Sequence, residues 1–343
     1  MVSYAVHHTR RHERPRGRHR WWFVALTAVV LAVAAVVTVV IGGGAIYAGS
    51  VASSFDSHVT HIHDAFPAAA ARPAATATGA TNILLLGSDS RGAPTEVGAT
   101  GVSDQRSDTM MLVHIDADRK NVYVMSIMRD LWVPIPGNGS AKINAALAWG
   151  GTPLAIQTVE QLLGARIDHV AIIDFAGLKQ MTNALGGVDV DSPVAFTTVR
   201  PPHYSFVKGM NHLNGDQALA FARERYAFAN ADYQRVADQQ ALMKAFGAKL
   251  MSFSVLTDPG RLTGFAASAG SYVKVDQGFS LQAMLGLAAS MRLSGMSSIH
   301  TFTLPTAGTG RSADGQSIVN VDEAAVARLR TALATDTLGS FAG

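Results

Sequence analysis

Cysteine is absent from the 343-residue sequence. Disulfide bonds, thiol nucleophiles and cysteine-ligated metal centres are therefore excluded. Charged residues are also scarce, at 15% of the chain, so a place where several of them gather is informative. Without disulfides, the chain has to be held together by a hydrophobic core, and it is long enough for one large domain or two small ones.

The signatures of several common enzyme classes are missing as well. The chain has no G-x-S-x-G nucleophile elbow, no H-E-x-x-H zinc motif and no G-x-x-x-x-G-K-S/T phosphate loop. Its histidines form no metal-ligand pattern, because His114 falls in a predicted strand while His203 and His212 fall in or beside a loop. Paired carboxylates of the kind that hydrolyse glycosidic bonds are not excluded by the residues alone.

A long uncharged hydrophobic run lies near the N-terminal end. Residues 21–41 (WWFVALTAVVLAVAAVVTVVI) are long enough to cross a bilayer as a helix. Six arginines and one glutamate precede this run, whereas the first charged residues after it are Asp56 and Asp64. The positive-inside rule then predicts a single-pass protein of the cell membrane, with a cytoplasmic tail at 1–20, a transmembrane helix at 21–46 and all later residues extracytoplasmic.

The basic isoelectric point of about 9.2 comes from the short tail. Six arginines and one glutamate give the tail +5 of a net charge of +3, which leaves −2 for residues 21–343. The exported part therefore carries no basic footprint for nucleic acid, and we expect no nucleic-acid partner. An arginine-rich tail beside a membrane helix is typical of a topology signal that touches anionic lipid.

The exported part divides into a spacer and a folded domain. Residues 47–80 are predicted to be an extracytoplasmic stalk, because 67–80 are rich in alanine, proline and threonine without a hydrophobic period. The domain is expected over 81–343, where apolar strands alternate with helical patterns. Two strands at 109–115 and 122–127 are separated only by a turn and predict a hairpin. We therefore predict an α/β fold, a three-layer α-β-α sandwich with a mixed central sheet.

The individual elements follow from hydrophobic period and from glycine or proline punctuation. Strands are predicted at residues 82–87, 109–115, 122–127, 169–174, 188–191, 271–275 and 299–304. Helices are predicted at residues 143–149, 153–163, 176–185, 214–222, 232–252, 261–269, 281–291 and 323–334.

Charged side chains gather where the first three predicted strands begin or end. Asp89 and Arg91 follow the first strand, Arg106 and Asp108 precede the second, and Arg129 follows the third. Each aspartate taken alone is typical of a turn or a cap. Together they sit on neighbouring strands, where Mg²⁺ favours one or two carboxylates alongside phosphate oxygens. The surrounding arginines therefore favour a phosphate-bearing ligand.

A second group of basic residues lies in 214–240 (NGDQALAFARERYAFANADYQRVADQQ). Residues two apart share a face only in extended chain, so we predict that a helix ends near Ala222 and that Arg223 and Arg225 project together. Arg235 and Gln239 are four apart and share one face of the next helix. The alternative is a solvated basic face, neutralised by nearby carboxylates at Glu224, Asp232 and Asp238.

Six sequence blocks then occur in order along the domain. They are NILLLGSDSR (82–91), RSDTMMLVHID (106–116), SIMRD (126–130), KINAALAWGG (142–151), DFAGLKQMTNALGGVDV (174–190) and FARERY with DYQRVADQQ (221–240). Together they resemble the LytR–CpsA–Psr (LCP) family of cell-wall proteins. The resemblance covers about 81–250 clearly, and the remainder to about 335 fits the end of the same domain.

The resemblance implies an enzyme with a defined reaction. It would be a membrane-anchored phosphotransferase that moves a glycopolymer from a polyprenyl (undecaprenyl or decaprenyl) diphosphate carrier to a peptidoglycan sugar hydroxyl. The product is a phosphodiester, and the cofactor is Mg²⁺, or Mn²⁺ in its place. By position, the implied catalytic residues are Asp89, Arg106, Asp108 and Arg129, with Asp89 and Asp108 as the metal ligands. The implied diphosphate-binding residues are Arg91, Lys142, Arg223, Arg225, Arg235 and Gln239.

Two departures from the family pattern bear on the site. Met128 stands where many members have proline, and Trp132 and Val133 fall where some members carry a further arginine. The diphosphate is then held by one cation fewer, unless Arg91 substitutes. A polyprenyl tail also requires an apolar cavity, for which the inward faces of the helices at 176–185 and 241–253 are candidates; the alternative for these faces is an ordinary filled core.

Other functions stay open at this point. One alternative is a hydrolase that releases the polymer from its polyprenyl diphosphate carrier, and another is a non-catalytic protein that binds the lipid carrier or the wall. A membrane-bound transcription regulator is disfavoured, because the tail is short and has no helix-turn-helix pattern.

Overall fold

The structure is a computed structural model that describes residues 53, 55–75, 78–88, 107–228, 231–250, 252, 258–294 and 296–341. All of these belong to one compact unit, Val51–Gly343. The predicted tail and transmembrane helix at 1–46 lie outside the described residues. Within the described part, no helix combines the length and the apolar character needed to cross a membrane.

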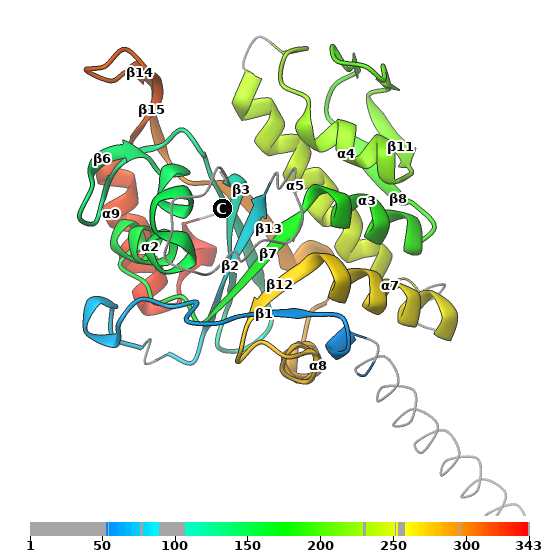
Figure 1. Ribbon diagram of the computed structural model, residues 1–343, viewed down its shortest axis with the longest axis horizontal. Helices are drawn as coiled ribbons and strands as arrows, with labels where there is room; N and C mark the ends of the chain where they lie inside the picture. Colours follow the sequence, from blue (N-terminus) through cyan, green and yellow to red (C-terminus); the bar gives the residue numbers. More distant parts are fainter. Residues whose placement is uncertain are drawn as a thin grey trace, which may run out of the picture. The chain divides into compact units, whose positions relative to one another are not determined.

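A seven-stranded sheet forms the centre of this unit, in the order β1-β12-β7-β2-β3-β4-β13 (Figure 1). The pairs β2–β7, β4–β13 and β1–β12 are parallel, and the others are antiparallel, which confirms the predicted mixed sheet. Its strands are β1 (Thr60–Ile62), β2 (Thr81–Ser88), β3 (Ser107–Ile115), β4 (Val122–Ile127), β7 (His169–Asp174), β12 (Val273–Asp276) and β13 (Ile299–Thr303).

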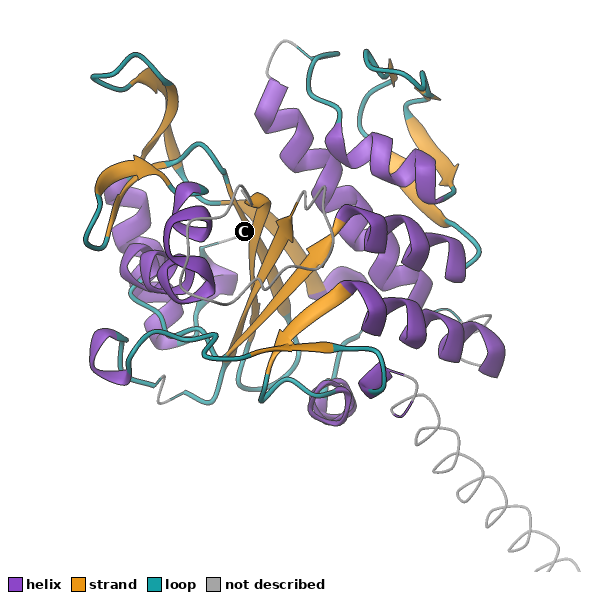
Figure 2. Ribbon diagram, in the orientation of Figure 1, coloured by secondary structure: helices purple, strands orange, loops and turns teal. Residues whose placement is uncertain are grey.

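Helices cover both faces of the sheet and make the three expected layers (Figure 2). One face carries α2 (Ala145–Leu163) and α9 (Glu323–Thr335). The other carries α3 (Phe175–Ala184), α5 (Ala231–Leu250) and α7 (Pro259–Tyr272), with α4 (Gly215–Arg223) packed against α3 and α5. The remaining helix, α8 (Leu281–Ser290), lies near β1 at the lower edge in Figure 1 and has no buried residue.

The two faces of the sheet are packed differently. Side chains alternate along each strand, so Leu84 and Leu112 point towards α2 and α9 and belong to a continuous buried core. On the opposite face, Leu85, Val113 and Ile173 are only half-buried, although they lie in three adjacent central strands. The core therefore fills the α2–α9 side more completely than the α3–α5–α7 side.

The hairpin of β3 and β4 is confirmed. Met110 lies opposite Ile127 and Ile115 opposite Val122, so the apolar side chains of the two strands share their faces. The connecting turn is closed by Asp116, whose carboxylate accepts hydrogen bonds from the backbone N–H of Asn121 at 3.0 Å and from its amide at 2.8 Å.

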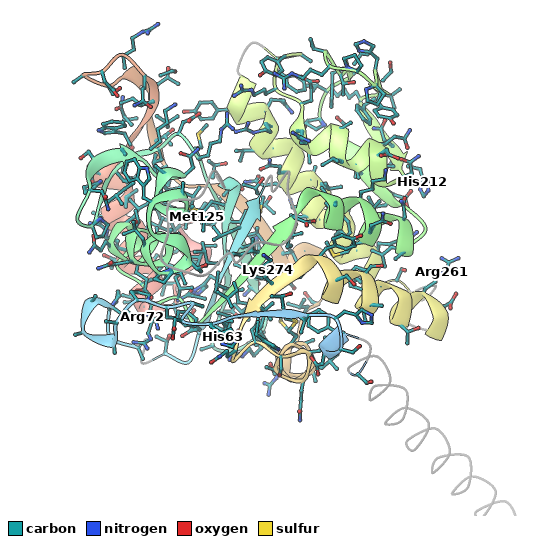
Figure 3. All side chains as sticks on the ribbon, in the orientation of Figure 1. His63, Arg72, Met125, His212, Arg261 and Lys274 are labelled. Atoms are coloured by element: carbon teal, nitrogen blue, oxygen red, sulfur yellow. The ribbon has the colours of Figure 1, made fainter. Side chains whose placement is uncertain are left out.

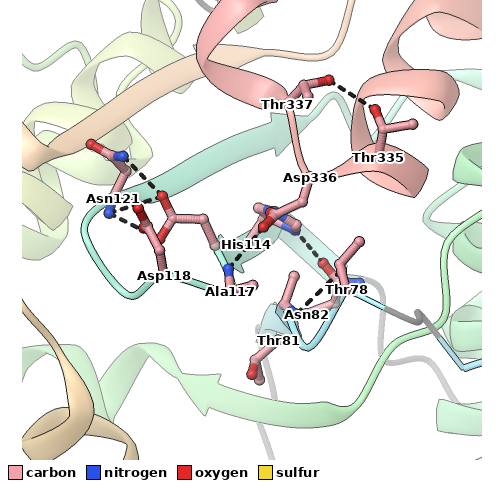
Figure 4. Close-up of polar contacts among 12 residues, drawn as sticks. Thr78, Thr81, Asn82, His114, Ala117, Asp118, Asn121, Thr335, Asp336 and Thr337 are labelled. Atoms are coloured by element: carbon pink, nitrogen blue, oxygen red, sulfur yellow. Dashed lines mark hydrogen bonds and ion pairs between the residues drawn. The ribbon is translucent and has the colours of Figure 1, made fainter.

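A buried histidine ties this hairpin to the last helix (Figure 4). His114 is 1% exposed; its Nδ1 lies 2.7 Å from Asn82 Oδ1 and its Nε2 3.0 Å from Asp336 Oδ1. Burial lowers the pKa of His114, and the hydrogen bond with Asp336 opposes that shift. Asp336 also accepts the N–H of Ala117 at 2.9 Å, so this cluster fastens the end of α9 to β2 and β3.

The two helices predicted at 143–149 and 153–163 lie on either side of a kink within α2. The backbone is non-helical at Gly150 and Gly151, which separate them. Gly151 has φ = 62°, a left-handed conformation that a side chain disfavours, so glycine lets the chain bend there without ending. The helix stops at Gly164, which also has φ = 62°, as the sequence predicts.

The predicted stalk at 47–80 needs correction, because much of it belongs to the folded domain. Strand β1 pairs in parallel with β12, and Phe55 and Ile62 are 4% and 2% exposed. Further along, Arg72, which is labelled in Figure 3, forms an ion pair with Glu160 of α2 at 2.7 Å. Residues 55–75 are therefore an edge of the domain. The sequence hides this because the alanine- and proline-rich stretch carries no hydrophobic period of its own.

Several short elements outside the central sheet were not predicted. They are mostly two-stranded pieces whose partners lie in loops. The strands are β5 (Trp132–Ile135), β6 (Gly139–Lys142), β9 (Phe196–Thr197), β10 (Ser205–Phe206), β11 (Gly209–Leu213), β14 (Thr306–Arg311) and β15 (Ser317–Val321), with β11 paired to the expected β8 (Val188–Ser192). The single-turn 3₁₀ helices are η1 (Ala69–Ala71), η2 (Met296–Ser298) and η3 (Leu338–Ser340).

Candidate functional site

Helix α4 has well-defined ends. At its start, Asn214 Oδ1 accepts the N–H of Gln217 and Gln217 Oε1 accepts the N–H of Asn214, each at 3.0 Å, which is a capping box. At its end, Glu224 has φ = −66° and ψ = 135°, which is extended. The helix therefore stops one residue beyond the break predicted near Ala222.

The break brings the two neighbouring arginines to one place. Arg223 ends the helix and Arg225 follows in extended chain, and both line the same cavity. On α5, Arg235 and Gln239 are buried, 6% and 8% exposed, and line that cavity too. Gln239 donates to the carbonyl oxygen of Ala222 at 3.1 Å, which ties α5 to the end of α4.

The carboxylate of Glu224 shapes the turn after α4. Its Oε1 accepts the N–H groups of Arg225, Tyr226 and Ala227 at 2.8, 2.6 and 3.1 Å, and its Oε2 accepts the N–H of Val199 at 2.9 Å. Glu224 is 5% exposed. The alternative of a solvated basic face with Glu224 as a counter-ion does not hold for this residue, because the acid binds backbone N–H groups and holds two loops together.

Two adjoining cavities form a cleft around these residues. The first has a volume of about 400 Å³ and the second about 370 Å³, and Arg129 and Arg225 line both. The basic residues of the first cavity are Arg129, Arg200, Arg223, Arg225 and Arg235. Lys142 lines the second cavity, with Asn144, Gln316 and Ser317. Six predicted site residues (Arg129, Lys142, Arg223, Arg225, Arg235 and Gln239) therefore meet in one cleft.

An acid positions the basic residues of the second cavity. Lys142 Nζ lies 3.0 Å from Asp130 Oδ1, and Arg129 Nε lies 3.6 Å from Asp130 Oδ2. Lys142 reaches this point because β6 pairs with β5, which starts two residues after Asp130. Val319 of β15 donates its N–H to the carbonyl oxygen of Asp130 at 2.9 Å. Asp130 thus joins three separate pieces of chain at the mouth of the cleft.

Arg200 and Tyr226 line the cleft but were not among the site residues predicted from the sequence. Arg200 comes from the loop before Pro201, and its Nη2 donates to the Tyr226 hydroxyl at 2.8 Å. Arg225 Nη2 donates to the same oxygen at 2.8 Å. Arg200 adds a cation to a site in which Trp132 and Val133 provide none. The Pro-Pro pair marked only a loop, and nothing local in the sequence indicated where that loop folds.

The remaining predicted site residues lie in or next to the range 89–106, which is outside the described residues. Asp89, Arg91 and Arg106 are outside the described residues, and Asp108 is described only as part of β3. Among the described residues, no group of three or more histidine and acidic side chains is arranged to hold a metal.

The strand register indicates which edge of the sheet the aspartates share. Gly87 pairs with Thr109 and Ser88 with Ser107, so position 108 falls in a bulge opposite the end of β2. Because β3 runs antiparallel to both β2 and β4, these two strands end at the same edge. Asp89 directly follows β2, and Arg129 follows β4, so the sequence positions predicted to bind metal and diphosphate leave the sheet at one edge.

A buried acid lies on α5, between Arg235 and Gln239 in the sequence. Asp238 of α5 is 0% exposed; its Oδ1 accepts from Gln234 Nε2 at 2.9 Å, and its Oδ2 has no hydrogen-bond partner among the described residues. Burial raises the pKa of Asp238 from 3.8 to about 7, the Gln234 hydrogen bond opposes this rise, and the charge of Glu224 adds to it. The folded protein therefore prefers the neutral acid below about pH 7.

Replacing this acid should stabilise the protein in a pH-dependent way. The pKa of Asp238 is higher in the folded protein than in the unfolded chain. The free energy of unfolding therefore falls as the pH rises from about 4 to about 7, because the buried carboxyl then has to ionise. We expect Asp238→Asn to raise the free energy of unfolding at pH 8 by roughly 2–4 kcal/mol, and by less at pH 5. Urea unfolding at both pH values measures this. Asp191→Asn, on the exposed face of β8, is the control, and an equal gain at both pH values would contradict the assignment.

The fold and cleft together define a class of protein: an α/β domain with an arginine-lined cleft suited to polyanionic groups. The LytR_cpsA_psr family model matches residues 48–335, and the chain belongs to this family. It is 34% identical over 247 residues to the polyisoprenyl-teichoic acid–peptidoglycan teichoic acid transferase TagU of Bacillus cereus, covering 70% of this chain and 77% of that one.

Other relatives agree in sequence and in fold. The TagU transferase of Enterococcus faecalis is 33% identical over 254 residues, covering 74% of this chain and 78% of that one. Among solved structures, B. subtilis TagV is 28% identical with a TM-score of 0.63, covering 76% of this chain and 98% of that chain. Family membership thus confirms the resemblance inferred from the six sequence blocks.

Proposed function

We propose that this protein is a membrane-anchored, extracytoplasmic phosphotransferase. It transfers a glycopolymer from a polyprenyl diphosphate carrier to a sugar hydroxyl of peptidoglycan, and the product is a phosphodiester. The naming of similar proteins as polyisoprenyl-teichoic acid–peptidoglycan transferases supports this reaction class. Residues 21–46, which the sequence predicts to span the membrane, anchor the domain beside its lipid-linked substrate.

The observation that carries the proposal is the convergence of five arginines on one cavity. A guanidinium binds phosphate oxygens through two parallel N–H donors, so a set of them suits a diphosphate better than a neutral sugar. These arginines come from four separate segments of chain, which are the turn after β4, the loop at Arg200, the end of α4 and the start of α5. Such a collection of like charges favours an anionic ligand, because a bound anion offsets part of their mutual repulsion.

The chain's own residues account for most of the reaction chemistry. The arginines hold the diphosphate and stabilise the negative charge that moves onto the leaving polyprenyl phosphate. Arg129 and Arg225, which line both cavities, are positioned to contact the group transferred between donor and acceptor. The acceptor sugar hydroxyl attacks the sugar-linked phosphorus from the side opposite the leaving polyprenyl phosphate.

Asp89 and Asp108 would hold Mg²⁺. Their sequence positions fit, because two carboxylates leaving one sheet edge beside a diphosphate are the donor set that Mg²⁺ favours. When bound, Mg²⁺ neutralises phosphate charge and polarises the phosphoryl oxygens.

The incompletely packed face of the sheet supports a lipid carrier. Leu85, Val113 and Ile173 are half-buried on the side of α3 and α5, where the sequence predicted an apolar cavity. A polyprenyl tail lying there would cover apolar surface that the helices leave accessible, at about 25 cal/mol per Å².

One experiment separates the possible reactions. The full chain in detergent is incubated with a polyprenyl diphosphate glycan, Mg²⁺ and peptidoglycan oligomers, and the products are analysed by mass spectrometry. We expect a phosphodiester conjugate that disappears with a metal chelator and in Asp89→Ala. Free glycan phosphate would indicate a hydrolase instead, and unchanged substrate bound to the protein would indicate a carrier-binding protein. Asp56→Ala, at the far N-terminal edge of the domain, is the control and should retain transfer.

A further inference from the structure

Tyr226 occupies an unusual position at the mouth of the cleft. Its hydroxyl oxygen accepts hydrogen bonds from Arg200 Nη2 and Arg225 Nη2, each at 2.8 Å. The two guanidinium carbons also lie 4.6 and 4.7 Å from the centre of its ring. The side chain remains 49% exposed and lines the first cavity. Two charged donors therefore converge on one phenol oxygen that a ligand in the cleft can still reach.

The Tyr226 oxygen can make one further hydrogen bond, through its own O–H group. A phenol has two acceptor lone pairs and one donor proton, and the two arginines use the lone pairs. The remaining O–H has to point away from both guanidinium groups. Because each guanidinium carries further N–H donors, Arg200 and Arg225 can bind Tyr226 and a phosphate at the same time. The phenol oxygen then lies next to the bound diphosphate.

The described carboxylates in and near the cleft already form hydrogen bonds or ion pairs with other groups of the protein. Glu224 accepts four backbone N–H groups, and Asp130 lies between Lys142 and Arg129. Asp216 pairs with Lys179 at 2.7 Å. Asp238 is fully buried, does not line the cleft and accepts a hydrogen bond from Gln234. Tyr226 lines the same cavity, and both hydrogen bonds to its phenol oxygen come from cations, which leaves the third lone pair of the phenolate for a proton.

We propose that the Tyr226 phenolate is the general base that takes the proton from the attacking sugar hydroxyl. This inference rests on the proposed transferase function. In the step, the sugar oxygen forms a bond to the sugar-linked phosphorus, and the bond from that phosphorus to the bridging oxygen breaks. The bridging oxygen leaves with the electron pair as polyprenyl phosphate. The hydroxyl proton moves to Tyr226 Oη and later to solvent.

The electrostatic surroundings of Tyr226 favour the phenolate. The hydrogen bond from Arg225 lowers the pKa of Tyr226; partial burial opposes it, and the charges of Arg225, Arg200 and Arg129 lower it further. The other charged group beside this turn is Glu224, which is held by backbone N–H groups. A group with a depressed pKa supplies more of its basic form near neutral pH than an ordinary tyrosine does.

The pH dependence of transfer tests the role. In the full-length protein, kcat should rise with pH until Tyr226 is ionised and then level off. Tyr226→Phe should lower kcat by about 10²-fold or more and abolish this rise. Replacing Tyr226 with a fluorotyrosine, which keeps the oxygen but has a more acidic phenol, should shift the inflection to lower pH. Tyr233→Phe is the matched control, because its hydroxyl contacts Thr306 and should leave the profile unchanged.

The outcomes distinguish this inference from the function on which it rests. An inflection that the fluorotyrosine leaves in place, or a pH rise that survives in Tyr226→Phe, would show that Tyr226 only positions the arginines and would overturn the proposal while transfer itself stands. Absence of transfer in the wild-type protein at every pH would refute the function instead. Spectroscopic titration of the tyrosinate, wild type against Tyr226→Phe, measures the ionisation without substrate; an ordinary phenol titration would also overturn the proposal.

Discussion

Arg129→Ala is expected to reduce transfer by roughly 10²–10³-fold without unfolding the domain. The Arg129 side chain is 18% exposed and lines both cavities, so under the proposed function it would contact the transferred phosphate in either one. Loss of the guanidinium removes charge stabilisation that is strongest as the polyprenyl phosphate leaves. The measurement is kcat/KM for conjugate formation, with thermal unfolding recorded for the same protein.

Two control variants test whether the loss of activity is specific to the guanidinium of Arg129. Arg129→Lys keeps the charge but loses the two-pronged donor geometry, so its activity should fall between the wild type and the alanine variant. Arg328→Ala removes an exposed arginine of α9 whose Nη1 donates only to Ala324 of the same helix. That variant should retain full activity. Wild-type transfer by Arg129→Ala would rule out the assignment of the cleft as the diphosphate site.

The largest effect on stability is expected from Glu160→Ala, at about 3–5 kcal/mol. Glu160 is 0% exposed on α2 and binds Arg72 through Nε at 3.0 Å and Nη2 at 2.7 Å. It also accepts the N–H of Ile167 at 2.9 Å. The alanine variant would leave the Arg72 charge, whose side chain is 7% exposed, buried without its partner. Chemical denaturation followed by circular dichroism measures the loss.

Removing both charges distinguishes the pair from simple packing. Because an unpaired buried charge is the main cause of the loss, Glu160→Leu combined with Arg72→Met should be less destabilising than Glu160→Ala alone. Asp118→Ala, which breaks an ion pair with Lys120 whose side chains are 53% and 62% exposed, should leave stability unchanged. A double variant as unstable as the sum of its parts would show that the two residues act independently.

The elements with a strong local pattern could be predicted from the sequence. The limits of β4 and β7 match their predicted ranges, because an apolar run closed by turn residues is visible without knowing its partners. The end of α4 was also predictable, since Arg223 and Arg225 serve one ligand only if the chain becomes extended between them. Arg235 and Gln239 needed only helical spacing.

Features that depend on distant partners were not predictable. Strand β1 is three residues long and exists because β12 lies beside it, more than 200 residues later in the chain. The pairing of Arg72 with Glu160 is equally remote. A short polar or alanine-rich segment carries no sign of such a partner, so it looked like a spacer.

The sequence by itself determined the family, the order of the main strands and helices along the chain, and the residue types of the proposed diphosphate site. Tertiary structure decided which of these residues meet. It brought Arg200 from an unpatterned loop into the cleft, turned Glu224 inward to hold backbone N–H groups, and placed Tyr226 between two arginines. The physical reason is that side-chain chemistry and local period are written along the chain, whereas charge burial and convergence depend on how separate segments pack.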